Sequence, residues 1–176
     1  MTKDEFYKSV EQDTLIRHIE QTGTPCYLFF PDMIEQKVLA LSQCLGSCFS
    51  IHYAVKANPH EDILKTMAKL DLGADVASGG ELKAALDCGI LPEKIEFSGP
   101  GKTEEELILA ISQGIGSVNA ESLDELEILA RLSEQSRIIP NVGIRVNPDV
   151  KNVKSGMKMA GATQFGMDES EMANAL

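Results

Sequence analysis

The chain has 176 residues, and its 27 acidic and 16 basic side chains give a net charge of −11. This charge offers no basic field for nucleic acid or for an anionic membrane. The first residues are too charged for a signal peptide, and no apolar run approaches the length of a membrane span. We therefore expect a cytoplasmic protein with one sizeable core, bound neither to nucleic acid nor to a membrane.

Four cysteines, Cys26, Cys44, Cys48 and Cys88, show no disulfide framework, and we expect reduced, mostly buried thiols. The spacing of Cys44, Cys48 and His52 could suggest a metal site. His52 lies in a predicted strand, however, so the three side chains cannot share one helix face. We therefore predict no metal site.

The start of the chain is polar and amphipathic. Residues 1–22 are predicted to form a helix that leads into the main domain. The apolar segment 25–30, PCYLFF, predicts a short strand. Asp32 then stands at a predicted helix N-cap with Glu35 at the capping-box position, and this helix is expected to reach about Leu45.

The segment IHYAVKANP, residues 51–59, predicts a strand followed by a helix with Asn58 as its N-cap. Lys56 therefore lies at the carboxyl end of a strand, where parallel α/β proteins bind ligands. A lysine there could remain a solvated cation. Partly buried among apolar neighbours, its amine could instead lose its proton and attack a carbonyl carbon. Residue type alone leaves both interpretations open.

A strand–helix unit repeats from this segment onward, with a period of a little over twenty residues. Strands are predicted to begin near Ile51, Ala74, Ile95, Val118 and Val142. Capping boxes are predicted at Ser78–Glu81, Thr103–Glu106 and Ser122–Glu125. Strands that alternate with helices at this period indicate a parallel sheet with helical crossovers.

Two architectures fit this order, a (β/α)8 barrel and a doubly wound sheet. In VGIRVNP, residues 142–148, one face of the predicted strand is apolar and the other becomes polar toward the carboxyl end. A doubly wound sheet covers both faces with helices, so both faces should be apolar. We therefore predict an α/β fold that forms the N-terminal part of a (β/α)8 TIM barrel. The barrel is incomplete, because only about five of its eight units fit into 176 residues.

The polar faces of these strands bring side chains of both charges to one end of the predicted barrel. They are Lys56, Asp75, Ser98, Glu121, Arg145 and Asn147. Converging charges of both signs are what a barrel active site requires. The alternative is a ring of solvated strand ends.

Four motifs occur in order along the chain. They are YAVKAN (53–58), DVASGGE (75–81), SGPGKT (98–103) and RVNP (145–148). Each alone is weak, but from about Thr24 to Met167 their combination resembles the fold-type III pyridoxal-phosphate decarboxylases, which include the diaminopimelate, ornithine and arginine decarboxylases. The resemblance implies a barrel of the alanine racemase-like type. It implies a lead-in segment over residues 1–24 and the first part of the barrel over residues 25–176, with the remaining units and a C-terminal β domain absent.

The resemblance also implies roles for single residues. Lys56 would form the Schiff base with pyridoxal 5′-phosphate. Asp75 would lie beside the cofactor, Glu81 near the Schiff base, and Arg145 would reach the region of the cofactor ring. Glu81 could also complete the capping box that begins at Ser78.

The SGPGKT turn is not a nucleotide-binding P-loop. A P-loop would require glycine at position 96, where Glu96 stands. We interpret Gly99 and Gly101 as turn residues and expect Lys102 to be a surface residue.

These roles predict a pyridoxal-phosphate-dependent carboxy-lyase that acts on an amino acid, as a homodimer in its complete form. The segments 155–161 and 163–167 carry a KMAG…QFG pattern. Diaminopimelate decarboxylases usually carry an H-x-x-I-x-T-G-type stretch followed by K-F-G at this place. The KMAG…QFG pattern resembles the branch of siderophore, antibiotic and exopolysaccharide pathways, which implies a conjugated or carrier-linked substrate. The alternatives are a diaminopimelate decarboxylase of lysine biosynthesis, a pyridoxal-phosphate-dependent racemase and a non-catalytic cofactor-binding barrel.

Overall fold

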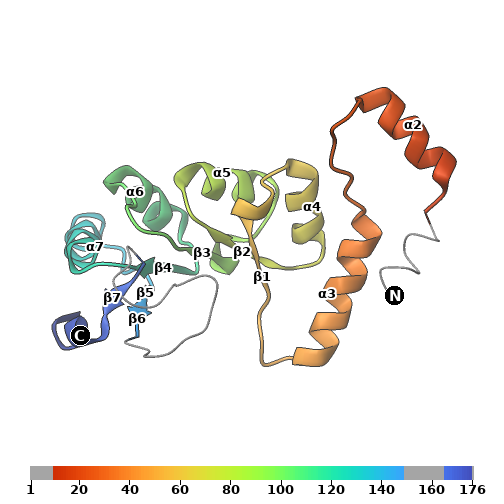
Figure 1. Ribbon diagram of the computed structural model, residues 1–176. Coiled ribbons are helices and arrows are strands. Elements are labelled where there is room, and N and C mark those ends of the chain that lie inside the picture. Colours follow the sequence, from red (N-terminus) through yellow and green to blue (C-terminus); the bar gives the residue numbers. More distant parts are fainter. Residues whose placement is uncertain (1–9, 149–164, 176) are drawn as a thin grey trace. The chain divides into compact units, whose positions relative to one another are not determined.

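The computed structural model describes residues 10–148 and 165–175, and the chain divides into two units (Figure 1). The first unit, Met1–Ile34, contains α2 (Gln12–Thr22) and the first residues of α3 (Pro31–Leu45). The second unit, Glu35–Leu176, contains the rest of α3 and a parallel sheet with its helices. Within the described ranges, no helix is long and apolar enough to cross a membrane.

The strand predicted over residues 25–30 is wrong. No described strand pairs with this segment, and two of its aromatic side chains are exposed, Tyr27 by 91% and Phe29 by 55%. A strand requires hydrogen bonds to a neighbour, so an apolar sequence alone does not form one. The helix predicted to reach Leu45 is confirmed as α3, but it starts at Pro31, which places Asp32 in the first turn rather than at the N-cap.

The expectation of mostly buried cysteines is also wrong. Cys26, Cys44 and Cys48 are exposed and only Cys88 is partly buried, although all four are free thiols as expected. Cys44 lies on α3, a helix that has no buried residue. Burial of a thiol depends on what packs against its helix, which the sequence around a single cysteine does not indicate.

Five parallel strands form the main sheet in sequential order (Figure 1). They are β1 (His52–Ala54), β2 (Gly73–Val76), β3 (Ile95–Phe97), β4 (Ser117–Ala120) and β5 (Val142–Ile144). The crossover helices are α4 (Glu61–Lys69), α5 (Gly79–Asp87), α6 (Glu104–Gln113) and α7 (Leu123–Ser136). The short elements are the 3₁₀ helices η1 (Val55–Ala57), η2 (Pro92–Lys94) and η3 (Glu169–Glu171), and α8 (Met172–Ala175). Each of these five strands starts within one residue of its predicted position. The strand order does not reverse as in a doubly wound sheet.

The three predicted cap residues start their helices, but only Thr103 and Glu106 form a complete capping box. The carboxylates of Glu81 and Glu125 accept from the N–H of the residue before the cap instead. Ser78 Oγ accepts a hydrogen bond from Glu81 N at 3.2 Å, and Ser122 Oγ accepts one from Glu125 N at 3.2 Å. Thr103 caps α6 in the same way. Such caps satisfy backbone N–H groups that have no partner inside the helix.

The start of α4 differs from the prediction. His60, not Asn58, is the N-cap, and its Nδ1 accepts a hydrogen bond from Asp62 N at 3.3 Å. Asn58 instead accepts from His60 N at 3.0 Å and so shapes the turn before the helix. Asn58 is the C-cap of η1, so α4 begins only after it.

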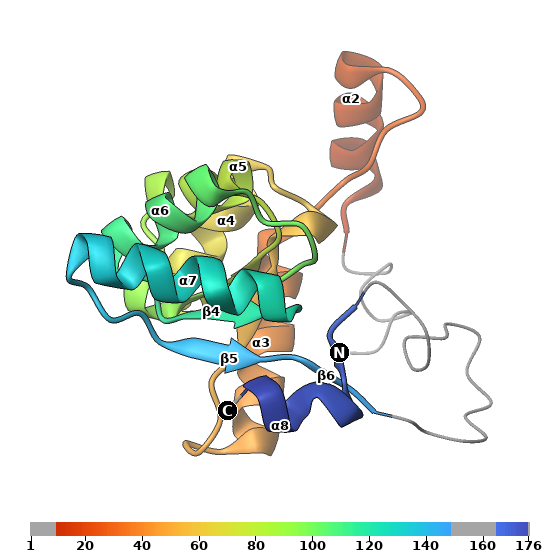
Figure 2. The same ribbon diagram turned by 90° about the vertical axis from the view of Figure 1, so that its left-hand side faces the viewer.

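The two faces of the sheet differ as predicted in β2, β3 and β4. In the predicted strand 142–148 they do not, because Val142 and Val146 are 39% and 38% exposed whereas Asn147 is 5% exposed. One face is buried beneath α4 to α7, which lie side by side along it (Figure 2). Its fully or almost fully buried residues are Ala74, Val76, Ile95, Phe97, Val118 and Ala120. The intervening residues Asp75, Glu96 and Asn119 are only partly buried. Apolar packing against helices on one face and polar residues on the other is the pattern of a barrel wall.

The predicted strand VGIRVNP is divided at Arg145. β5 pairs with β4, whereas β6 (Val146–Asn147) pairs in parallel with β7 (Met167–Asp168). The backbone of Arg145 joins both ladders, because its N–H donates to Ala120 O at 2.9 Å and its carbonyl accepts from Met167 N at 2.8 Å. β7 was not predicted, because two residues are too few to show a hydrophobic period. It continues the succession of parallel strands beyond β5.

Candidate active site

Lys56 lies in η1, directly after β1, and its side chain is exposed. Ala54 pairs with Asp75 on β2, so Lys56 and Asp75 belong to neighbouring strands at their carboxyl ends. Tyr53 Oη donates a hydrogen bond to Asn58 O at 3.2 Å, which ties the turn that carries Lys56 back to β1. Burial raises the pKa of Tyr53 above its ordinary value. The predicted place of Lys56 at the end of a strand is therefore confirmed.

Asp75 presents a polar atom without a partner. Its Oδ1 is buried, and no hydrogen-bond donor reaches it within the described part of the chain. A buried carboxylate oxygen without a donor is unfavourable by about 1–3 kcal/mol or more, and most such atoms in proteins have a partner. A polar ligand at the carboxyl end of β2 would supply the missing donor.

Glu81 has a defined structural role. Its Oε2 accepts a hydrogen bond from Ala77 N at 2.8 Å, and its own N–H is bonded to Ser78 Oγ. The carboxylate thus closes the turn between β2 and α5. Its expected role near the Schiff base stays a prediction.

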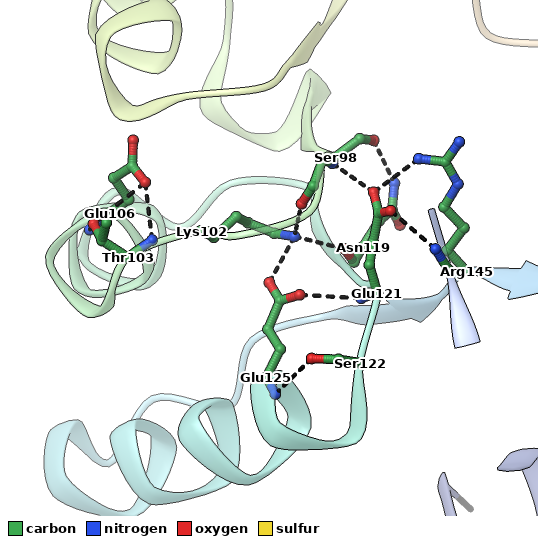
Figure 3. A network of polar contacts seen from close by, with 11 residues as sticks. Ser98, Lys102, Thr103, Glu106, Asn119, Glu121, Ser122, Glu125 and Arg145 are labelled. Carbon is green, nitrogen blue, oxygen red and sulfur yellow. Dashed lines mark hydrogen bonds and ion pairs between the residues drawn. The ribbon is translucent and has the colours of Figure 1, made fainter. Parts of the chain in front are cut away.

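Glu121 and Arg145 form the centre of a polar network (Figure 3). Arg145 Nη1 donates to Glu121 Oε1 at 2.8 Å, and the Glu121 side chain is only 2% exposed. The guanidinium of Arg145 also lies over the ring of Phe165, 5.0 Å from its centroid. Asn119 Nδ2 donates to Ser98 Oγ at 3.1 Å in the same region.

Lys102 is buried, so its prediction as a surface residue is wrong. Its side chain is 1% exposed, and its Nζ lies 2.6 Å from Glu125 Oε1 (Figure 3). Nζ also donates to Gly99 O at 2.8 Å and to Asn119 O at 2.9 Å. The turn that begins at Gly99 places the Lys102 amine near the carboxyl ends of β3 and β4, where its three acceptors lie. A signal was present in the sequence, since Lys102 is the single basic residue in the acidic stretch 95–130.

The predicted set of inward residues is brought together only in part. Ser98, Glu121 and Arg145 belong to one connected network, and Asn147 is buried beside it in β6. Among residues 10–148 and 165–175, no hydrogen bond or ion pair joins Lys56 to this network or to Asp75. Lys56 follows β1 and Arg145 follows β5, so the two residues lie at the carboxyl ends of the first and fifth strands of the sheet.

A hollow of about 310 Å³ lies at the opposite end of the strands. It is lined by residues before or at the strand starts, among them His52, Gly73 and Lys94. Ligands of parallel α/β barrels bind at the carboxyl ends of the strands. The candidate site is therefore the polar end that carries Lys56, Asp75 and Arg145, and not this hollow.

The fold and the site define a βα-barrel protein with a ligand site at the carboxyl ends of its strands. Residues 32–176 match the family model described as pyridoxal-dependent decarboxylase, pyridoxal binding domain. The chain belongs to this family, and its sheet is the N-terminal part of the family's barrel. The resemblance predicted from the four motifs is confirmed.

Two curated relatives show the range of the family. A diaminopimelate decarboxylase of Zymomonas mobilis is 41% identical over 172 residues, which are 94% of this chain and 41% of that protein. The L-glutamyl-[BtrI acyl-carrier protein] decarboxylase of Niallia circulans is 39% identical over 163 residues, 92% of this chain and 38% of that protein. The chain thus spans about two fifths of the length of these relatives.

A solved structure has a similar fold. The diaminopimelate decarboxylase from M. jannaschii, in co-complex with L-lysine, is 32% identical and superposes with a TM-score of 0.81. The match covers 92% of this chain and 40% of that structure's chain.

Proposed function

We propose that this chain contributes the lysine-bearing part of a pyridoxal-phosphate-dependent amino-acid decarboxylase. The observation that carries the proposal is Lys56 at the carboxyl end of β1, beside a strand whose Asp75 has a buried oxygen without a partner in the described chain. The family match makes pyridoxal phosphate the ligand that this lysine would hold. The site combines an amine, carboxylates and a guanidinium, which suits a cofactor with an aldehyde and polar ring substituents.

The chain's own residues would bind and orient the cofactor. Lys56 would hold it through its amine, Asp75 would face its polar substituents, and Arg145 would set the charge near its ring. Glu81, in the first turn of α5, would tune the amine of Lys56. When bound, the cofactor supplies the electron sink that accepts the electron pair released as carbon dioxide leaves the substrate.

The complete active site would require more of the barrel than this chain contains. The relatives are longer by more than a factor of two, and the strand ends described here line only one side of a lumen. We propose that a longer protein, acting as a cytoplasmic homodimer, supplies the remaining units and a C-terminal β domain. The lead-in segment 1–24 and the barrel segment 25–176 would then be its first two parts.

The proposed substrate is an amino acid joined to a carrier or another larger group. The KMAG…QFG pattern motivates this choice, although residues 155–164 lie outside the described ranges. The relative that acts on an L-glutamyl carrier protein is almost as similar to this chain as the diaminopimelate decarboxylase of Zymomonas mobilis. Free diaminopimelate is the second candidate, because several similar relatives carry that name.

Carbon dioxide release tests the proposal. The full-length protein would be loaded with pyridoxal phosphate and given free meso-diaminopimelate or L-glutamate linked to an acyl-carrier protein, with K56A as the inactive control. Faster release from the carrier-linked substrate is expected. Faster release from free diaminopimelate would overturn the substrate proposal alone, whereas racemisation without carbon dioxide release would overturn the decarboxylase proposal.

A further inference from the structure

Glu121 is a buried carboxylate that joins three separate segments of the chain. Its Oε1 accepts hydrogen bonds from Gly99 N at 2.7 Å and from Arg145 Nη1 at 2.8 Å. Its Oε2 accepts from Gly166 N at 3.1 Å. The side chain is 2% exposed, so these donors replace the water that a carboxylate otherwise needs (Figure 3).

Arg145 depends on this carboxylate for its direction. Its side chain is 32% exposed and has several rotatable bonds, so without fixed partners it would sample many rotamers. Glu121 holds one end of the guanidinium, and the ring of Phe165 lies against its face. The charge-assisted hydrogen bond to a buried acceptor limits Arg145 to a narrow range of orientations.

Glu121 is itself held in place from the other side. Its backbone N–H donates to Glu125 Oε2 at 3.0 Å, and Glu125 forms the buried ion pair with Lys102. Glu121 and Glu125 therefore both have a partner in the turn after β3, Gly99 N for Glu121 and Lys102 for Glu125, and Glu121 also pairs with Arg145 after β5. This connection fixes Glu121 at the carboxyl end of β4, pointing toward Arg145 (Figure 3).

We propose that Glu121 is a positioning residue, which orients the Arg145 guanidinium toward the bound cofactor without touching the cofactor itself. This inference rests on the proposed function, because it assigns Glu121 a role at the same site. A purely structural role is the alternative, in which Glu121 only joins the turns at Gly99 and Gly166.

A double-mutant cycle separates these two roles. The dissociation constant of pyridoxal phosphate would be measured by its visible absorption band for the folded full-length protein and for E121Q, R145M and E121Q/R145M. E121Q keeps the shape of the side chain and an acceptor for Gly99 N, but removes the charge that pairs with Arg145. Glu127 is an exposed residue on α7, so E127Q is the matched control.

If Glu121 acts through Arg145, E121Q is expected to raise the dissociation constant about tenfold when Arg145 is present and less than twofold in the R145M background. E127Q is expected to bind as the wild type does. Equal changes in both backgrounds, or no change in either, would overturn the inference.

A variant that shortens the side chain covers the case in which E121Q does not fold. E121D keeps the charge but loses one methylene, so it cannot reach Gly99, Arg145 and Gly166 together. It is expected to raise the dissociation constant about threefold only when Arg145 is present, and an unchanged constant would overturn the inference. Absence of cofactor binding by the wild-type protein would instead overturn the proposed function.

Discussion

Replacing Lys102 by methionine is expected to destabilise the protein strongly, although the sequence suggested a surface residue. The substitution keeps most of the apolar stem and removes the charged amine. Glu125, whose side chain is 8% exposed, then retains its charge without the cation 2.6 Å away. The carbonyls of Gly99 and Asn119 also lose their donor.

The expected loss is about 3–5 kcal/mol in the free energy of unfolding, the usual effect of removing one partner of a buried ion pair. Glu125 still accepts a hydrogen bond from Glu121 N, which favours the lower end of this range. The double variant K102M/E125Q should be more stable than K102M, because a neutral glutamine removes the unpaired charge and can still accept that bond.

Urea unfolding followed by circular dichroism measures the effect. The matched control is R131M, which breaks the pair between Arg131 and Glu104, where both side chains are more than 40% exposed. Water and salt screen such a pair, so R131M should unfold at nearly the wild-type midpoint. If K102M were no less stable than R131M, the burial of Lys102 and the network built on it would be refuted.

Two further predictions concern acid stability and the chain in isolation. Hydrogen bonds from Gly79 N and Thr103 N hold the pKa of Glu106 below its ordinary value of 4.5, with the bond from Gly79 the larger cause. The stability contributed by this carboxylate is therefore present above pH 4.5 and lost as the pH falls through the lower pKa of the folded state. The difference in unfolding free energy between wild type and E106Q should shrink in acid, and a difference that grew there would contradict this sign. Residues 1–176 alone should bind pyridoxal phosphate weakly, release no carbon dioxide and self-associate, because open strand edges favour association. Equilibrium dialysis and size-exclusion chromatography would check this, and a monomer with tight binding and turnover would contradict it.

The strands and most helix starts could be predicted because their signals are local. Each strand start of the five-stranded sheet was predicted to within one residue, and Ser78, Thr103 and Ser122 cap the helices that were expected to follow. A capping side chain and its N–H partner are three residues apart in the sequence, so both are visible in it. The family was predicted for the same reason, since its motifs are short and contiguous.

Several errors concern partners that are distant in the sequence. Lys102 meets Glu125 only after the chain has passed through α6 and β4, and its burial depends on that return. Segment 25–30 has an apolar composition but no described strand beside it. The role of Glu121 could not be predicted either, because Gly99, Arg145 and Gly166 converge on it only in the folded sheet.

Chemical trapping of the cofactor would show which lysine of the protein holds it. The full-length protein would be incubated with pyridoxal phosphate and reduced with borohydride, which converts an imine into a stable secondary amine. Peptide mass spectrometry would then locate the added group. We expect a single modified lysine, Lys56, and no stoichiometric label in K56A. A label on another lysine, or no label on the wild-type protein, would contradict the claim that the end of β1 holds the cofactor.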